Sequence, residues 1–309
     1  MTKPCFNARY GVDPTTSPPG AGVACQRCFN ARYGVDPTTP QSLQDLGLLR
    51  LLFGPSEGRF ITEYPSDWRE RFHAYARSLG DLQAHRAVEV LQQLKHALLA
   101  EGEAPSWDSA RSWAENASPL KAELDWMDLL GPPGSPAPVK VFQKLLDEAE
   151  PLPPSRGALI WMTADAYAKA ARPLMLTSPK IILVDKYFDP RKPDRAEVLV
   201  ALLRVALEGG KVNYLEVCNN YKFPEEHKNA IDDCLRKVDA KDRIKTEVKS
   251  IQRGGKNKGI SVHARYLLGN HGGPHFDHGF QIHSPEKPTR NDVQWLERSK
   301  WEDLWAHYG

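Results

Sequence analysis

Disulfide chemistry is one of the features that this 309-residue sequence lacks. It has five cysteines, an odd number, and they are scattered along the chain. Such a set suits free thiols in a reducing compartment better than a disulfide framework. Cys25 and Cys28 form a CxxC pair, but no fourth zinc ligand is near them in the sequence. We therefore interpret these thiols as incidental and expect a cytoplasmic protein.

Long apolar runs and an excess of charge are also missing. No run approaches the roughly eighteen residues of a membrane span, and the opening "MTKPCFNARYGVDPTT" lacks the apolar core of a secretory signal. The 41 basic residues exceed the 39 acidic ones by only two, too few for a protein that coats nucleic acid non-specifically. We expect no transmembrane segment, and any contact with a polyanion must come from a local patch.

What the sequence does contain begins with a repeat. "CFNARYGVDPTT" occurs at 5–16 and again, letter for letter, at 28–39. A solenoid needs at least three diverged copies to bury a core, so one identical partial copy indicates a recent local duplication. We expect residues 1–27 to be loose and the second copy to begin the folded chain.

Helical patterns dominate residues 28–130. Apolar spacing predicts helices over 40–54 and 81–102, and Ser66 is suited to cap a third between them. The alternating "GRFITEYP" at 58–65 predicts one short strand. We interpret this region as a mostly helical accessory domain.

Two proline-rich stretches flank one expected helix at 139–150, and proline favours extended linkers over helix. Residues 131–156 are therefore interpreted as a linker. From 157 to 309 the signals alternate between helix and strand, which predicts an α/β fold with a mixed sheet flanked by helices. Expected helices span 157–176, 194–210, 224–238 and 291–309, and expected strands span 180–190, 211–220, 243–251 and 260–270.

Five of the ten histidines lie between His263 and His283. In the strand expected at 260–270, His263 and Arg265 project from the same side, roughly 7 Å apart. A histidine can serve as nucleophile or as acid and base, and a neighbouring permanent cation can hold phosphate oxygens. The pair therefore suits phosphoryl chemistry, although a strand pair without any chemistry fits the pattern equally well.

The segment "HARYLLGN" at 263–270 resembles the HxKxxxxD motif of the phospholipase D superfamily, with Arg265 at the lysine position and Asn270 at the aspartate position. The resemblance covers about 157–284 and implies an α/β fold that carries the motif on a strand. It implies that His263 forms a phosphohistidine, that Arg265 binds the phosphate, and that a second histidine protonates the leaving group. Further site candidates downstream of the motif are His278, Gln281 and Ser284.

The single copy of the motif and its changed last letter qualify this resemblance. Related proteins with one motif need two chains to complete a site, which implies a homodimer. Asn270 removes the carboxylate that would orient the partner histidine. A non-catalytic module that binds nucleic acid, an anionic lipid or a protein partner therefore stays open as the alternative.

Cationic residues near the motif suit a phosphate backbone. The segment 252–259 precedes the motif and combines Arg253, Lys256 and Lys258 with glycines, a composition that also fits a solvated turn. Lys186 follows a buried strand, beside Asp185, where α/β proteins usually form their sites. An accessory domain followed by such a module resembles bacterial antiviral effectors, so we expect nucleic acid as substrate and a defence-system protein as a possible partner.

A zinc site is the third hypothesis. His271, His275 and His278 have spacings that could supply nitrogen ligands for a hydrolytic metal. The segment is rich in glycine and has no helix to hold ligands at fixed spacing. We therefore favour the phosphohistidine hypothesis and expect no cofactor.

Overall fold

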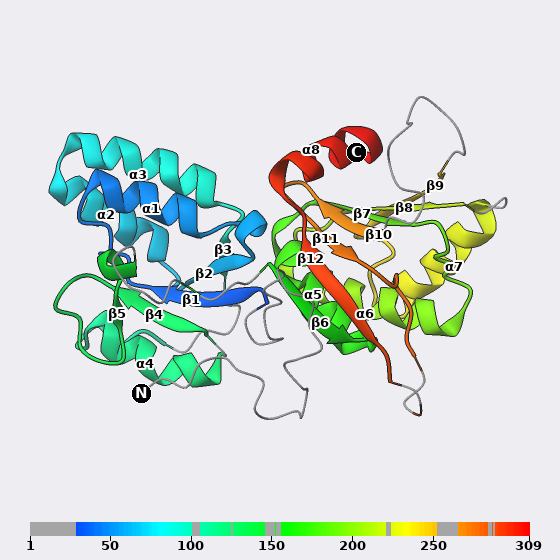
Figure 1. Cartoon of the computed structure of the whole chain (residues 1–309), viewed down its shortest axis with the longest axis horizontal. Helices are drawn as coiled ribbons and strands as arrows, with labels where there is room; N and C mark the ends of the chain where they lie inside the picture. Colours follow the sequence, from blue (N-terminus) through cyan, green and yellow to red (C-terminus); the bar gives the residue numbers. More distant parts are fainter. Residues whose placement is uncertain are drawn as a thin grey trace, which may run out of the picture.

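The computed structural model describes residues 29–100, 106–124, 126–145, 152, 156–220, 224–251, 265–283, 286 and 288–309. Several expectations fall outside these residues: the loose segment 1–27, the cationic segment with Arg253, Lys256 and Lys258, the proposed nucleophile His263, and Ser284. The rest of the chain forms two sheets that lie side by side, each with its own helices (Figure 1).

The first sheet has five parallel strands in the order β3-β2-β1-β4-β5. Its strands are β1 (Ala31–Val35), β2 (Arg59–Glu63), β3 (Leu98–Ala100), β4 (Asp128–Gly131) and β5 (Lys140–Val141). Its helices are α1 (Leu43–Leu52), α2 (Trp68–Leu79), α3 (Asp81–Leu94) and α4 (Trp113–Glu123), with 3-10 turns at Pro55–Glu57 and Phe142–Leu145.

The expectation of a mostly helical N-terminal region therefore needs correction. The expected helices are present, and α1 begins at a capping box in which Ser42 and Asp45 bond each other's backbone N–H groups. They cover a parallel sheet, however, of which the sequence predicted only the strand that became β2. The other strands are short, and all but the two-residue edge strand β5 are mostly buried, as in β4, so they show no clear alternation of apolar and polar residues.

The expected linker at 131–156 is also partly wrong. β5 pairs with β4, so the first sheet continues beyond residue 131. A helix was expected at 139–150. The described part of this segment instead forms β5 followed by the 3-10 turn at Phe142–Leu145. Phe142 and Leu145 of that turn are buried in the core of the first half, which holds the segment there.

The second sheet has seven strands in the order β6-β12-β11-β10-β7-β8-β9. β7, β8 and β9 are parallel, and the remaining pairs are antiparallel. The α/β fold with a mixed sheet is confirmed. Its strands are β6 (Gly157–Trp161), β7 (Lys180–Asp185), β8 (Tyr214–Asn219), β9 (Lys245–Ser250), β10 (Arg265–Gly269), β11 (Pro274–Phe276) and β12 (Arg290–Trp295).

Four helices accompany this sheet: α5 (Ala164–Thr177), α6 (Pro193–Gly209), α7 (Pro224–Arg236) and α8 (Arg298–Tyr308). The helix expected at 157–176 is wrong in its first part, because β6 precedes α5. Ala158 and Ile160 are buried while Leu159 and Trp161 are exposed, the alternation of an edge strand. Thr163 then caps α5 by accepting a hydrogen bond from the Ala166 N–H.

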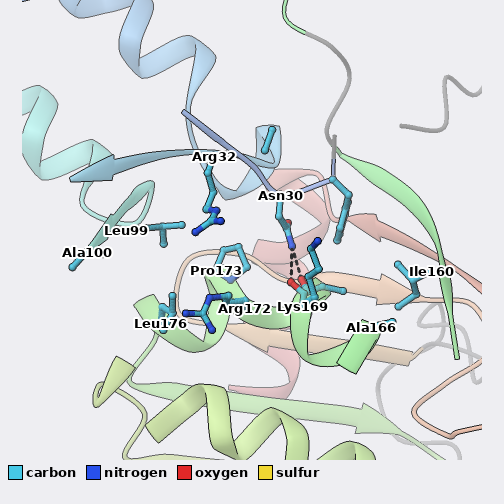
Figure 2. A pocket seen from close by; sticks show the side chains of 13 residues that line it. Asn30, Arg32, Leu99, Ala100, Ile160, Ala166, Lys169, Arg172, Pro173 and Leu176 are labelled. Atoms are coloured by element: carbon cyan, nitrogen blue, oxygen red, sulfur yellow. Dashed lines mark hydrogen bonds between the residues drawn. The ribbon is translucent and has the colours of Figure 1, made fainter. Parts of the chain in front are cut away.

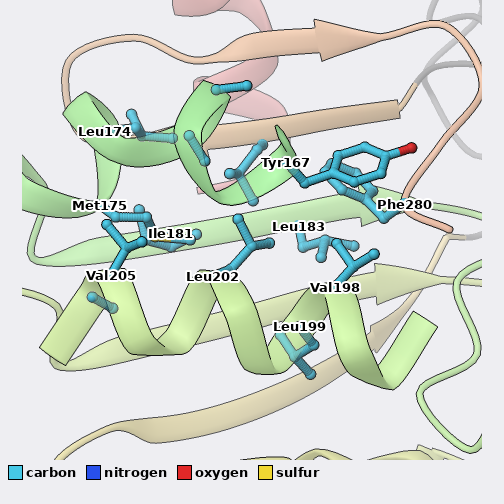
Figure 3. Packing of buried hydrophobic residues seen from close by; sticks show 14 of the residues in the cluster. Tyr167, Leu174, Met175, Ile181, Leu183, Val198, Leu199, Leu202, Val205 and Phe280 are labelled. Carbon is cyan, nitrogen blue, oxygen red and sulfur yellow. The ribbon is translucent and has the colours of Figure 1, made fainter. Parts of the chain in front are cut away.

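Both faces of the second sheet are covered near β7. On one face, Val198, Leu202 and Val205 of α6 point toward Ile181 and Leu183 of β7 (Figure 3). On the other face, Ile182, Val184, Tyr266 and Leu268 pack with Leu304 of α8. The alternation expected along the strand that became β10 is thus confirmed for its described residues. No helix in the described ranges is long and apolar enough to cross a membrane.

Candidate active site at the carboxyl edge of β7 and β8

The polar residues of interest gather where β7 and β8 end. β7 ends at Asp185 and its parallel neighbour β8 ends at Asn219. β10 runs antiparallel to β7, so its first residue, Arg265, is the register partner of Asp185. The carboxyl ends of parallel strands are the usual place for ligand sites in α/β folds. We name this group the edge site.

Asp185 is the buried carboxylate of the edge site, with an exposed fraction of 3%. Its Oδ1 accepts a 2.9 Å hydrogen bond from the Tyr187 N–H, and the Phe280 N–H lies 3.4 Å from Oδ2. The Arg265 Nε is 3.9 Å from Oδ1. Burial raises the pKa of Asp185, while the Tyr187 amide and the Arg265 guanidinium oppose that rise. The carboxylate therefore holds Arg265 in position.

Arg265 is fixed on two sides. Its Nη1 donates to the carbonyl of Asp277, and its guanidinium carbon lies 6.0 Å from the centre of the Tyr187 ring. Gly279 closes over it with a φ of +79°, a conformation that favours glycine. A Cβ at Gly279 would lie 2.6 Å from Asp185 Oδ2 and 2.8 Å from Arg265 Cδ. Only glycine lets the backbone approach the pair this closely.

A buried hydrogen-bond network fixes the loop that carries Gly279. The Tyr167 hydroxyl on α5 donates to the Gly279 carbonyl at 2.6 Å. Asn291 on β12 donates to both of these oxygens, at 3.0 and 3.1 Å, and accepts from the His278 N–H at 2.9 Å. Burial raises the pKa of Tyr167 to about 12, so the hydroxyl stays a donor. Sequence reasoning missed both side chains, in part because it expected residues 291–309 to form a helix, whereas Arg290–Trp295 form β12.

A second polar chain adjoins the edge site. Arg195, near the start of α6, donates to Gln281 Oε1 at 3.1 Å, and its charge opposes the rise that burial causes in the pKa of Asp185. Gln281 Nε2 lies 3.0 Å from His283 Nε2, and His283 Nδ1 lies 2.9 Å from Thr289 Oγ1. A cavity of about 480 Å³ lies alongside, lined in part by His283, Thr289 and Trp161. Arg195 is a further residue that the sequence did not single out.

Asp189 forms a third polar group at the same edge. It accepts hydrogen bonds from the Arg191 side chain at 2.9 and 3.1 Å, which hold its pKa below the usual range although burial opposes this. His227 of α7 is fully buried, with Nε2 3.7 Å from Asp189 Oδ1 and Nδ1 2.9 Å from the Asn219 amide. Burial lowers the pKa of His227. We interpret it as a neutral residue that ties α7 to the end of β8.

The structure brings several of the predicted site residues to this edge. Besides Arg265 and Gln281, it places His278 in the loop that Arg265 bonds, with its Nε2 3.6 Å from Asp277 Oδ2. Lys186 follows Asp185, with its Nζ 4.6 Å from the Tyr187 ring centre. His278 is exposed and Lys186 is half-buried.

Asn270 does not belong to this group. It follows the far end of β10, where its Oδ1 accepts a 2.9 Å hydrogen bond from the Lys180 N–H at the start of β7. Asn270 lies five positions after Arg265 in the sequence, which corresponds to roughly 16 Å along a strand at about 3.3 Å per residue. We therefore correct the expectation that it acts beside Arg265, because its side chain caps the opposite end of the sheet.

The three histidines of the zinc hypothesis do not converge either. The His271 ring stacks on His96 of the first half, His275 lies in β11 with its ring 5.3 Å from that of Tyr266, and His278 is exposed beyond β11. Among the described residues, no group of three His, Cys, Asp or Glu side chains is arranged to hold a metal ion. The extended backbone of β11 separates these histidines instead of gathering them.

Comparisons with known proteins place the chain in no family. No family model matches the sequence, and no curated protein matches it. Among solved structures, the chain has a distant similarity to polyphosphate kinase from Porphyromonas gingivalis, with 16% identity and a TM-score of 0.32. The match covers 56% of this chain and 29% of the kinase chain. We therefore infer a function from the geometry of the edge site.

Proposed function

We propose that this chain binds a phosphodiester at the edge site and cleaves it with His263 as the nucleophile. The observation that carries the proposal is the register of Arg265 with Asp185, which holds a guanidinium at the carboxyl edge of a parallel strand pair. A guanidinium there can bind non-bridging phosphate oxygens and offset the charge of the transition state. Continued strand alternation would put His263 on the same side of the strand.

The proposed reaction has two steps. An imidazole nitrogen of His263 attacks phosphorus, a P–O ester bond breaks, and the leaving oxygen takes a proton from His278. Water then attacks the phosphohistidine and gives a proton back to His278, the P–N bond breaks, and His263 is released with the phosphate monoester as product. Arg195 and Lys186 add positive charge near the phosphate, and Gln281 can donate its amide to a substrate oxygen.

Nucleic acid is the proposed substrate class. Arg253, Lys256 and Lys258 precede His263 in the sequence, and cations that neutralise phosphates supply most of the affinity for a polynucleotide backbone. The single copy of the motif supports a homodimer in which the partner subunit contributes the second half of the site. A role as an effector of antiviral defence belongs to the same proposal.

Binding without cleavage is the second candidate. The observation that favours it is the engagement of Arg265, whose Nη1 is bonded to the Asp277 carbonyl while its Nε faces Asp185. A guanidinium held in this way has fewer donors to offer a substrate. The same edge would then serve as a docking point for a phosphate-bearing polymer.

A cleavage assay separates the two candidates. Wild type, His263→Ala, Arg265→Gln and the control His85→Ala are incubated with labelled single- and double-stranded DNA and RNA, with EDTA and with added metal. His85 is exposed on α3, remote from the edge site. We expect EDTA-resistant cleavage that falls at least about a hundredfold in His263→Ala and is unchanged in the control.

The other outcomes are equally informative. Cleavage abolished by EDTA would contradict the phosphohistidine mechanism in favour of a metal. Binding without cleavage under every condition would establish the second candidate. Reactions with a phosphorus-labelled substrate, quenched in alkaline denaturant because acid hydrolyses the P–N bond, should also leave the label on wild type and not on His263→Ala.

A further inference from the structure

A second cavity, independent of the edge site, lies at the junction of the two halves (Figure 2). Its volume is about 80 Å³. One wall comes from the start of β1 and the end of β3 in the first half, and the other from α5 and β6 in the second half. Any molecule bound here would touch both halves of the chain.

The charge of this junction cavity has one sign. The described residues that line it include three cations, Arg32, Lys169 and Arg172. No aspartate or glutamate is among the described lining residues. Arg32 donates to the carbonyl of Leu124, and Arg172 donates to Glu208 on α6 at 2.6 Å. Glu208 does not line the cavity, so its charge compensates Arg172 from outside. The described lining of the cavity is therefore electropositive.

The rest of the lining strengthens this field. Leu99, Ile160 and Pro173 supply apolar walls beside the cations. Low-dielectric walls focus the field of nearby charges on the space between them. In Figure 2, Arg32 extends from β1 toward α5, where Arg172 and Pro173 lie, while Lys169 extends toward Asn30.

Asn30 fixes the two walls relative to each other. Its amide nitrogen donates to the Ala170 carbonyl on α5 at 2.7 Å, and its Oδ1 accepts from the Trp295 indole at 2.6 Å. Phe29, Phe60 and Leu99 of the first half are part of the main core of the second half. The cavity is therefore preformed, and a ligand need not order it.

We infer that the junction cavity binds a small phosphate-bearing molecule, with its phosphate between Arg32 of the first half and Lys169 and Arg172 of the second. Arginine offers the planar, bidentate donor geometry that phosphate prefers, and a lysine adds a point charge. The small volume favours a single phosphate with a compact apolar group and does not suit a polymer. Such a ligand would join the two halves and stabilise them together.

Calorimetric titration of the full chain tests this inference. The probes are inorganic phosphate, methyl phosphate and methanol, at constant ionic strength in chloride because salt screens such contacts. We expect phosphate and methyl phosphate to bind and methanol not to bind. Arg32→Gln and Arg172→Gln should each weaken phosphate binding about tenfold or more, the usual effect of losing a charged hydrogen bond.

Two controls make the result specific. Arg204→Gln removes an exposed arginine of α6 outside the cavity and should leave the affinity unchanged. Repeating every titration in an Arg265→Gln background removes phosphate bound at the edge site, so failure of the proposed function leaves this test intact. Circular dichroism checks folding, and Lys169→Gln replaces any variant that does not fold.

The inference would be overturned by either of two results. One is the absence of phosphate and methyl phosphate binding at millimolar concentration in the Arg265→Gln background. The other is an affinity that stays the same in Arg32→Gln, Lys169→Gln and Arg172→Gln.

Discussion

The edge site and the junction cavity place their arginines in different surroundings. At the edge site, Arg265 faces the buried Asp185 carboxylate within its own sheet. At the junction cavity, Arg32 and Arg172 line a space from two different halves; Arg172 pairs with Glu208 outside the lining, and no acidic residue is among the described lining. A cation paired with a buried carboxylate fixes local geometry, whereas cations of one sign around a cavity favour an anionic ligand. The same residue type thus supports a framework in one place and recognition in the other.

The largest loss of stability should come from separating the Arg265–Asp185 pair of the edge site. Asp185→Ala removes the acceptor of the Tyr187 N–H and leaves Arg265 without its carboxylate. We expect the free energy of unfolding to fall by about 2 to 4 kcal/mol. Urea denaturation measures it, with Asp165→Ala, near the start of α5, as a control. A fall of less than about 0.5 kcal/mol in the free energy of unfolding would show that the Arg265–Asp185 pair does not stabilise the fold.

A backbone change at the edge site should have the next largest effect. In Gly279→Ala, the added Cβ would meet Asp185 and Arg265 in a left-handed backbone conformation. We expect a loss of about 1 to 3 kcal/mol together with weaker phosphate binding at the edge site. Gly134→Ala is a matched control, because Gly134 has a φ of +88° with open space around it. Equal losses in the two variants would point to backbone strain alone.

The next prediction concerns Asn30, whose side chain connects the two walls of the junction cavity. Asn30→Gly keeps the left-handed backbone, with φ near +57°, but removes the hydrogen bonds to Ala170 and Trp295. We expect a loss of about 1 to 2 kcal/mol and weaker phosphate binding at the junction cavity, without any change at the edge site. Titration in the Arg265→Gln background separates the two sites. Unchanged binding would mean that the Asn30 side chain does not preform the cavity.

The smallest effect concerns pH at the same junction. Burial, with smaller contributions from the neighbouring His271 and Lys95, lowers the pKa of His96 to about 3, and burial with Lys95 lowers that of His271 to about 4. Below the ordinary pKa of 6.5, the unfolded chain therefore binds more protons than the folded one. The stability from this stacked pair is complete above about pH 6.5 and is lost as the pH falls toward 4.

Urea midpoints at about pH 7.5 and about pH 5 check this expectation. A His96→Gln, His271→Gln double variant should show a smaller decline between the two values than wild type. An equal decline would assign the pH dependence to groups elsewhere.

Much of the second half could be predicted from its sequence. The apolar run before Asp185 predicted β7, and alternation in the strand that became β10 placed Arg265 on the face opposite Tyr266 and Leu268. These patterns are local, so a single strand or helix shows them in full. Apart from β2, the strands of the first half were not predicted, because β1, β3 and β4 are short and mostly buried and β5 has only two residues, so their sequences are compatible with helix or strand.

Only part of the edge site could be predicted, because several of its residues come from distant parts of the sequence. Arg265, Gln281, His278 and Lys186 stood out because they belong to a motif or follow a buried strand. Tyr167, Arg195 and Asn291 reach the edge site from α5, α6 and β12, far away in the sequence. Asn270 shows the reverse case: it is close to Arg265 in the sequence, but an extended strand carries it to the other end of the sheet.

Local sequence patterns establish the α/β alternation of the second half and the side of β10 from which Arg265 projects, because strand and helix periodicity are properties of neighbouring residues. The parallel sheet of the first half, the pairing of Arg265 with Asp185 and the cavity between Arg32 and Arg172 arise instead from long-range packing. These features depend on which distant segments pack together, and burial sets that choice through contacts that no local pattern encodes.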